Sequence, residues 1–202
     1  MPRGTLVLAS RNEKKLEELS ALLAGSGLVL LSPADFPELL ELPETGQSFA
    51  ENARLKAEAA LRHTGLAALA DDSGLEVDAL DGAPGILSAR FAGEGADDAA
   101  NNALLLRRLE GLPRERRGAH FTCVLALALP GRPVRLFEGR ADGRILARAR
   151  GRGGFGYDPL FFSSDLNKTF AEAAPAEKNE ASHRARALRA FARALQEEGP
   201  LA

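Results

Sequence analysis

Residues 5–31 read TLVLASRNEKKLEELSALLAGSGLVLL, and this stretch contains the pattern from which the fold class follows. Its apolar start, residues 5–9, predicts a short buried strand, and leucines at helical spacing over residues 16–23 predict a helix. Two glycines end that helix before residues 28–31, which predict a second strand. Because a helix makes the crossover, the two strands should lie parallel. The stretch therefore predicts an α/β architecture.

Similar patterns predict the elements in the middle of the chain. Ser48 and Glu51 have the spacing of a capping box, which predicts a helix over about residues 49–63. Residues 66–70 predict a strand that ends in the Asp-Asp-Ser-Gly sequence at 71–74. Residues 75–77 then predict another strand.

The second half of the chain carries antiparallel signals. In order, the patterns predict a helix capped by Asp97 or Asp98, a hairpin of strands 121–129 and 134–138, a turn at Asp142-Gly143, and a last helix over about residues 182–198. Parallel and antiparallel pairing should therefore occur in the same protein.

Length and composition limit the class of protein. The chain has 202 residues, which suits one domain over residues 1–202. It has 26 Lys and Arg against 28 Asp and Glu, a net charge of -2, which disfavours nucleic acid as a partner. No apolar run is long enough for a signal peptide or a membrane span, and Cys123 is the single cysteine. We therefore expect a cytoplasmic protein with no membrane partner.

The first polar cluster has the residue types of a phosphate site. Residues 10–15, SRNEKK, join the first strand to its helix, where free backbone N–H groups and the helix dipole suit a phosphate. Asn12 can cap this helix and Lys15 can add a full charge. A capped helix with a solvated basic turn is the alternative interpretation. Glu44 and Lys56 belong to the second cluster, where a lone lysine is usually solvated.

The adjacent acids Asp71 and Asp72 form the third cluster, directly after an apolar strand. Neighbouring side chains in an extended chain point to opposite faces, so one of the two should face a site. Such a carboxylate is a natural ligand for Mg²⁺, which proteins bind through one or two carboxylates together with substrate phosphates. A plain Asp-Ser-Gly turn is the alternative, because turns use the same residues.

The fourth cluster is the glycine-rich segment 153–159, GGFGYDP, with residues 177–179 and 182–184 downstream. Glycines on both sides of Phe155 allow the backbone to approach a ligand closely and leave the ring free to stack on a flat heterocycle. A phenylalanine that plugs the core is the alternative. For His183 and Arg184 the alternative is a helix turn of solvated charge.

Together these clusters resemble the inosine triphosphate pyrophosphatase family, which hydrolyses non-standard purine nucleoside triphosphates. The matching segments lie in the family's order: LVLASRNEKKLEEL at 6–19, ETGQSFAENARLKAEAA at 44–60, ALADDSGLEVDALDGAPGILSARFAG at 68–93, GRGGFGYDPLF at 151–161 and EKNEASHRARAL at 177–188. The resemblance implies an α/β fold with a mixed, elongated central sheet flanked by helices, and two lobes that enclose a nucleotide cleft. It also implies a homodimer that uses Mg²⁺ to convert ITP, dITP and XTP to monophosphate and pyrophosphate.

The resemblance also implies a role for each matching residue. Asp72 would be the proton acceptor, and Glu44 and Asp72 would bind the metal. The substrate would be bound by Ser10, Arg11, Asn12, Glu13, Lys14, Lys15, Lys56, Ser73, Phe155, Gly156, Tyr157, Asp158, Lys178, His183 and Arg184. Many relatives read Thr-Gly-Asn where this chain has Ser-Arg-Asn at 10–12. The chain therefore departs from the family pattern at Arg11, and if the glycine of those relatives has a positive φ, the loop must bend differently here.

Three other functions are weighed against this one. A related pyrophosphatase could prefer pyrimidine or other modified triphosphates, but residues 155–158 and 178–184 match the purine-binding set. A nucleotide sensor without turnover would gain little from Glu44 and Asp72 beside a triphosphate. A nucleic-acid-binding module is the weakest alternative, because of the net charge.

Overall fold

The computed structural model describes residues 4–36 and 44–198. The strands are β1 (Gly4–Leu8), β2 (Leu28–Leu31), β3 (Ala68–Val77), β4 (Gly118–Ala128), β5 (Arg135–Ile145), β6 (Phe161–Ser163) and β7 (Lys168–Thr169). The α-helices are α1 (Glu13–Leu23), α2 (Phe49–Thr64), α3 (Asp98–Arg108), α4 (Pro175–Ala181) and α5 (His183–Glu198). Short 3-10 helices are η1 (Pro33–Asp35), η2 (Asp78–Leu80), η3 (Gly85–Arg90) and η4 (Arg114–Arg116). Within the described ranges, no helix is both long enough and apolar enough to cross a bilayer.

The strands form one mixed sheet in the order β2-β1-β3-β4-β5-β6-β7. β1 pairs in parallel with β2, as the strand-helix-strand pattern at the start of the chain predicts, and it also pairs in parallel with β3. β5 and β6 pair antiparallel, as do β6 and β7. β4 and β5 are neighbours joined by a connection too short for a parallel crossover. The predicted mixed α/β fold with flanking helices is confirmed.

The chain divides into two compact units. Unit 1 consists of residues 1–72, 123–139 and 184–202, and unit 2 consists of residues 73–122 and 140–183. The divisions fall inside β3, β4 and β5 and after the first residue of α5. Each of these long strands therefore contributes residues to both units.

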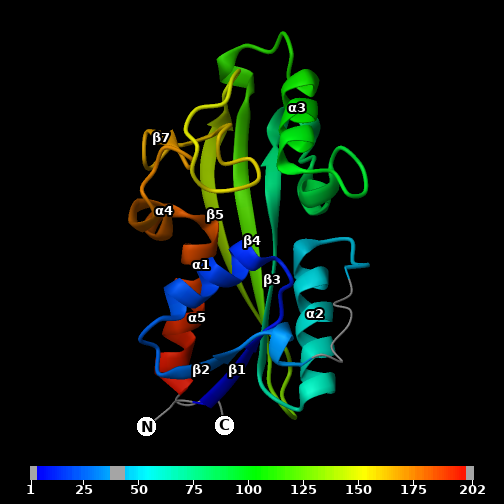
Figure 1. Ribbon diagram of the computed structural model, residues 1–202, viewed down its shortest axis with the longest axis vertical. Coiled ribbons are helices and arrows are strands. Elements are labelled where there is room, and N and C mark those ends of the chain that lie inside the picture. Colours follow the sequence, from blue (N-terminus) through cyan, green and yellow to red (C-terminus); the bar gives the residue numbers. More distant parts are fainter. Residues whose placement is uncertain (1–3, 37–43, 199–202) are drawn as a thin grey trace. The chain divides into compact units, whose positions relative to one another are not determined.

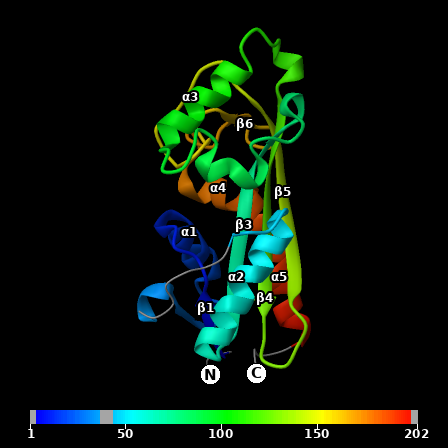
Figure 2. The ribbon, with the colours of Figure 1, turned by 90° about the vertical axis from the view of Figure 1, so that its right-hand side faces the viewer.

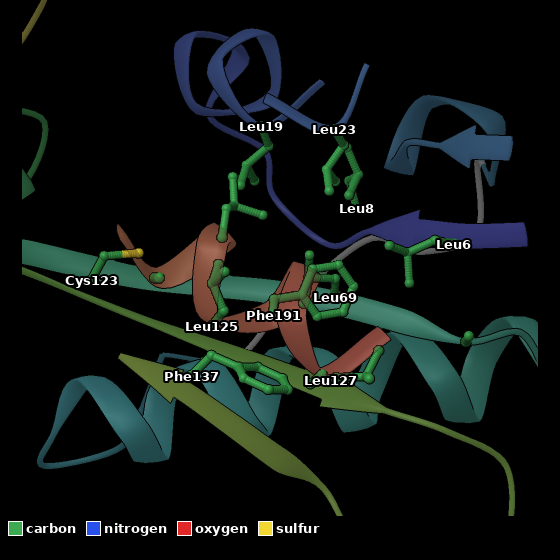
Figure 3. Close-up of a cluster of buried hydrophobic side chains, with 14 of the residues drawn as sticks. Leu6, Leu8, Leu19, Leu23, Leu69, Cys123, Leu125, Leu127, Phe137 and Phe191 are labelled. Atoms are coloured by element: carbon green, nitrogen blue, oxygen red, sulfur yellow. The ribbon is translucent and has the colours of Figure 1, made fainter. Parts of the chain in front are cut away.

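Unit 1 has its own apolar core. In the parts of the sheet that belong to unit 1, α1 and α5 cover one face and α2 covers the other (Figures 1 and 2). Leu19 and Leu23 of α1 and Phe191 of α5 pack with leucines of β1, β3 and β4. Figure 3 shows these side chains pointing into one cluster that also contains Cys123. Burial raises the pKa of this thiol to about 12, so Cys123 serves as a small core residue.

A second apolar core lies in unit 2 and is rich in aromatic rings. Leu105 of α3 and Leu109, which directly follows that helix, pack there with side chains of β3, β4 and β5. The ring of Phe121 lies 4.7 Å from that of Phe161 and 6.0 Å from that of Phe170, measured between centroids. This core supports the segment that connects β5 to β6, which contains the glycine-rich cluster.

The predicted end of the strand at residue 70 is wrong, and so is the alternative of a plain Asp-Ser-Gly turn. β3 runs without interruption from Ala68 to Val77, so Asp71, Asp72, Ser73 and Gly74 are strand residues. Both aspartates are buried and their carboxylates pair with cationic side chains. Turn-forming residue types did not produce a turn here. Their side chains pair with residues distant in the sequence, and their backbone groups form the hydrogen bonds of the sheet.

The predicted turn at Asp142-Gly143 is also wrong, because β5 continues to Ile145. Gly143 pairs with Ser163 of β6, and a Cβ at this position would come within 2.3 Å of the carbonyl oxygen of Phe162. The glycine is needed for close strand approach. The predicted capping box is half right. Ser48 accepts a hydrogen bond from the backbone N–H of Glu51, but the Glu51 carboxylate accepts from Gln47 instead of Ser48.

Candidate active site

The loop between β1 and α1 begins the candidate site in unit 1. Asn12 is the N-cap of α1, as predicted, and its Oδ1 accepts the backbone N–H of Lys15 at 3.1 Å. Ser10 is buried, and its Oγ accepts the backbone N–H of Asn12 at 3.3 Å. Residues 11–14 are exposed, so their side chains and the start of the helix face solvent. This geometry presents N–H groups and positive charge to an anion.

Asp71 lies on one face of β3 and is surrounded by cations. Its side chain is 1% exposed, and its Oδ2 lies 3.0 Å from Lys15 Nζ and 3.5 Å from an Arg184 guanidinium nitrogen. Burial by itself would raise the pKa of Asp71, but the charges of Lys15, Arg184 and Lys56 hold that pKa well below its usual range. Asp71 is therefore ionised in the folded protein at neutral pH.

Asp72 faces α2, on the side of β3 opposite to Asp71. Its Oδ1 lies 3.2 Å from Lys56 Nζ, and its Oδ2 accepts a hydrogen bond of 3.1 Å from Asn52 Nδ2. Burial raises the pKa of this carboxyl, against the opposing effects of Lys56, Lys15 and Asn52. Adjacent carboxyls on one strand thus have pKa values shifted in opposite directions, and Asp72 is the one shifted towards accepting a proton.

Glu44 and Asp72 converge on one cationic nitrogen. Lys56 Nζ lies 2.9 Å from Glu44 Oε1 and 3.2 Å from Asp72 Oδ1. Although burial opposes it, the charges of Asp71, Asp72 and Glu44 raise the pKa of Lys56, which therefore stays charged. Two carboxylates around one cation match what Mg²⁺ requires from a protein when phosphates and water complete its shell. Across the described residues, no three His, Cys, Asp or Glu side chains gather to form a fuller metal cage.

Asn52 is a functional candidate that sequence reasoning missed. While its Nδ2 donates to Asp72, its Oδ1 accepts the backbone N–H of Gly46 at 2.7 Å. A Cβ at Gly46 would come within 2.9 Å of that same Oδ1, so the glycine allows the close approach. Asn52 thus connects Asp72 with the segment that contains Glu44. Its position one helical turn before Lys56, on the same face of α2, was the available signal.

Arg184 belongs to unit 1 together with Asp71. Its side chain is 2% exposed, and its guanidinium pairs with Glu18 of α1 as well as with Asp71. These opposite charges raise the pKa of Arg184 despite burial. The preceding residue, His183, belongs to unit 2 and stacks on Phe121 with ring centroids 4.8 Å apart. The structure therefore assigns these two adjacent residues to different surroundings.

In unit 2, Asp158 organises the glycine-rich segment. Its Oδ2 accepts a hydrogen bond of 2.9 Å from the backbone N–H of Phe155 and one of 2.7 Å from Lys178 Nζ. Lys178 Nζ lies 4.8 Å from the centroid of the half-buried Phe155 ring. Gly154 has a φ of +72°, and a Cβ there would collide with Asp158 Oδ2 at 2.0 Å. The glycine is therefore required for this arrangement.

Two residues of α3 hold Gly156, and the sequence signalled neither of them as part of a site. Asp98 Oδ2 accepts the backbone N–H of Gly156 at 2.7 Å, and Asn102 Nδ2 donates to the Gly156 carbonyl at 2.8 Å. Tyr157 is buried and donates its hydroxyl to the Ser88 carbonyl at 2.9 Å. α3 and η3 thus fix the backbone on both sides of the segment. Sequence spacing cannot reveal such contacts, since the partners lie more than fifty residues apart.

The pKa of Asp71 leads to a prediction about stability and pH. Because its pKa is lower in the folded than in the unfolded protein, its ionised form stabilises the fold at neutral pH. That contribution should diminish once the pH falls below about 4, where the unfolded carboxyl takes up a proton first. We expect the difference in unfolding free energy between wild type and Asp71→Asn, measured by urea denaturation, to narrow from about pH 4 downwards. A difference that stays constant from pH 7 to pH 3 would contradict this.

Known proteins resemble the chain along nearly its whole length. A dITP/XTP pyrophosphatase of Geobacillus kaustophilus is 54% identical over 91% of this chain and 90% of that protein. One from Pseudomonas syringae pv. tomato is 58% identical over 91% of this chain and 92% of that protein. The structure of a HAM1 protein from Coxiella burnetii is 41% identical, covers 98% of this chain and 100% of its own, and superposes with a TM-score of 0.88.

The sequence model of the Ham1 family matches residues 6–194. This range contains all the site residues described above, both those of unit 1 and those of unit 2. The relatives at about half identity carry the pyrophosphatase name that the sequence resemblance implied. The chain therefore belongs to the Ham1 family.

Proposed function

We propose that this protein hydrolyses the non-standard purine nucleoside triphosphates ITP, dITP and XTP to monophosphate and pyrophosphate. The observation that carries the proposal is the convergence of Glu44 and Asp72 on Lys56. The capped start of α1, whose Lys15 pairs with the neighbouring Asp71, supports it. Relatives at 54% and 58% identity are named dITP/XTP pyrophosphatases, which supports the substrate class. We further infer that it acts in the cytoplasm as a homodimer.

The metal in this proposal is Mg²⁺, held by Glu44 and Asp72. A bound Mg²⁺ would supply positive charge to the phosphate oxygens. Lys56, which lies against both carboxylates, would add its own positive charge. Asn52 would keep Asp72 oriented through the hydrogen bond from its Nδ2.

In the reaction, water attacks the α phosphorus. A bond forms between the water oxygen and that phosphorus, while the bond to the bridging oxygen of the β phosphate breaks. Asp72 takes the proton from the water, for which its raised pKa suits it. Lys15, Lys56 and the N–H groups at the start of α1 stabilise the charge on the departing pyrophosphate.

In this proposal the residues around Phe155 and Lys178, in unit 2, recognise the base. The Phe155 ring offers a stacking surface, and Lys178 carries donors near that ring. Hypoxanthine and xanthine present a 6-keto acceptor, whereas adenine presents a 6-amino donor. Donors positioned for a keto oxygen remain unpaired against adenine, which disfavours ATP.

The direct test is to incubate the purified protein with ITP, XTP, GTP and ATP, with and without Mg²⁺, and to identify the products. Monophosphate plus pyrophosphate from ITP and XTP, dependent on the metal and with little turnover of ATP, is expected. Release of orthophosphate would place the cut at the terminal bond and contradict the proposal. Binding of ITP without any turnover would identify a sensor instead.

A substitution at Phe155 tests the base contact. Phe155→Ala should raise KM for ITP more than it lowers kcat, because it removes a stacking surface worth about 1–3 kcal/mol. Steady-state kinetics with ITP measure both constants. Phe36→Ala, at a half-buried phenylalanine of unit 1, is the matched control and should leave KM unchanged. An unchanged KM in Phe155→Ala would mean that this ring packs in the core and does not stack on the base.

A further inference from the structure

Unit 2 contains a cavity that shares no lining residue with either cluster described above. Its volume is about 330 Å³, within the range of sites for small molecules. Four arginines line it, Arg114, Arg117, Arg144 and Arg150, and leucine, isoleucine and alanine side chains form the rest of the wall. The cavity therefore combines dense positive charge with an apolar surface.

The local fold brings these arginines together. The backbone N–H of Ile145, at the end of β5, donates to the Arg117 carbonyl at 2.8 Å, which places η4 and the start of β4 beside residues 144–147. The backbone N–H of Arg150 then donates to the Pro159 carbonyl at 2.9 Å. The wall of the cavity is thus built on backbone hydrogen bonds, and its shape does not depend on the arginine side chains alone.

Two of the arginines have buried donors that no protein atom of the described ranges satisfies. The Arg117 side chain donates to the Leu112 carbonyl at 3.0 Å and to the Leu109 carbonyl at 2.7 Å, but its third nitrogen has no partner. Arg117 is 8% exposed, so this nitrogen is also withdrawn from bulk water. The Arg144 guanidinium lies 3.9 Å from the centroid of the Phe162 ring, and its Nε is buried without a partner. Unsatisfied buried donors are unfavourable and indicate a missing acceptor.

The charges around the cavity are not balanced. Among the described residues, Glu172 is the one acid that pairs with any of the four arginines, at 2.9 Å from Arg150. Burial, followed by the charges of Arg114 and Arg150, lowers the pKa of Arg144. A lowered pKa means that the surroundings disfavour the charged guanidinium, which a bound anion would correct.

We propose that this cavity is a binding site for a small phosphate compound that carries two or more negative charges. Guanidinium groups bind phosphate oxygens in paired hydrogen bonds, and the four arginines that line the cavity supply such groups. The apolar part of the wall accommodates the uncharged part of an organic phosphate. A small ligand fits better than a nucleic acid, because the site is a cavity and the whole chain has a net charge of -2. This site does not depend on the proposed hydrolysis.

The test is a titration with inorganic pyrophosphate in metal-free buffer, followed by backbone amide NMR. The backbone amides of residues 112, 114–117 and 144–150 should shift and saturate at millimolar concentrations or below. These amides report on the cavity alone, so binding of pyrophosphate to the unit 1 cluster would be seen separately at residues 10–15. In the Arg114→Ala/Arg144→Gln variant the affinity at the cavity should fall about tenfold or more, while turnover of ITP stays unchanged.

Arg148→Ala, at an exposed neighbour that does not line the cavity, is the matched control and should keep the wild-type affinity. The proposal is overturned if the cavity amides do not move up to about 10 mM pyrophosphate, or if sodium chloride of equal ionic strength moves them as much. It is also overturned if a short oligonucleotide shifts these amides and pyrophosphate does not. The wild-type titration decides the matter even if the double variant does not fold.

Discussion

Replacement of Asp72 by asparagine is expected to lower kcat for ITP by about 10²–10⁴-fold and to leave the fold intact. Asparagine has nearly the shape of aspartate and can still bond with Asn52, but it cannot accept a proton or carry the charge that a metal ion requires. Because burial raises the pKa of Asp72, the folded protein tolerates a neutral group at this position. Steady-state kinetics and urea denaturation together measure both effects.

Asp142→Asn is the matched control for this experiment. Asp142 is exposed on β5, where it pairs with Arg140 at 2.8 Å, and its removal should change neither kcat nor stability. A near-normal kcat in Asp72→Asn would remove Asp72 from the mechanism. Loss of activity together with loss of the folded state would instead assign Asp72 a structural role.

The second large effect is expected at Arg184. Arg184→Met should lower the unfolding free energy by about 3–5 kcal/mol, the usual result when one partner of a buried ion pair is removed. Methionine fills much of the space, but Asp71 then remains buried with Lys15 as its nearest cation, and Glu18 loses its guanidinium partner. Urea denaturation at pH 7 measures the change.

Arg189→Met, at an exposed arginine of the same helix α5, is the matched control and should change stability by less than about 0.5 kcal/mol. The experiment also separates two roles for Arg184. If the variant retained wild-type stability but raised KM for ITP, Arg184 would contact substrate, as the family resemblance implies. A loss of stability is the outcome that the contacts with Asp71 and Glu18 predict.

Features that depend on a few neighbouring residues were predictable from the sequence. Asn12 caps α1 and Ser48 caps α2, because each side chain bonds a backbone N–H three residues ahead. The parallel pairing of β1 and β2 followed from one apolar run, one helical period and a second apolar run. The prediction that Asp71 and Asp72 face opposite ways relied on strand geometry alone, and their partners lie on different helices.

Predictions failed where local signals competed with distant contacts. The Asp-Asp-Ser-Gly and Asp-Gly sequences are typical of turns, yet both lie inside long strands. In β3 the polar side chains find buried partners from α1, α2 and α5, and in β5 the glycine admits the neighbouring strand. The sequence carries no short-range mark of such partners, so turn chemistry was overestimated.

From its sequence alone, this protein could be recognised as an α/β chain with capped helices and with acids, lysines and a glycine-rich segment at element ends. Those properties arise from hydrogen bonds and apolar periodicity within a few residues. The three-dimensional arrangement was needed to shift the pKa values of Asp71 and Asp72 in opposite directions, to pair Arg184 with Glu18, and to gather four arginines around one cavity. These are Coulombic and desolvation effects between residues as far as 166 positions apart, and they exist only once the chain has folded.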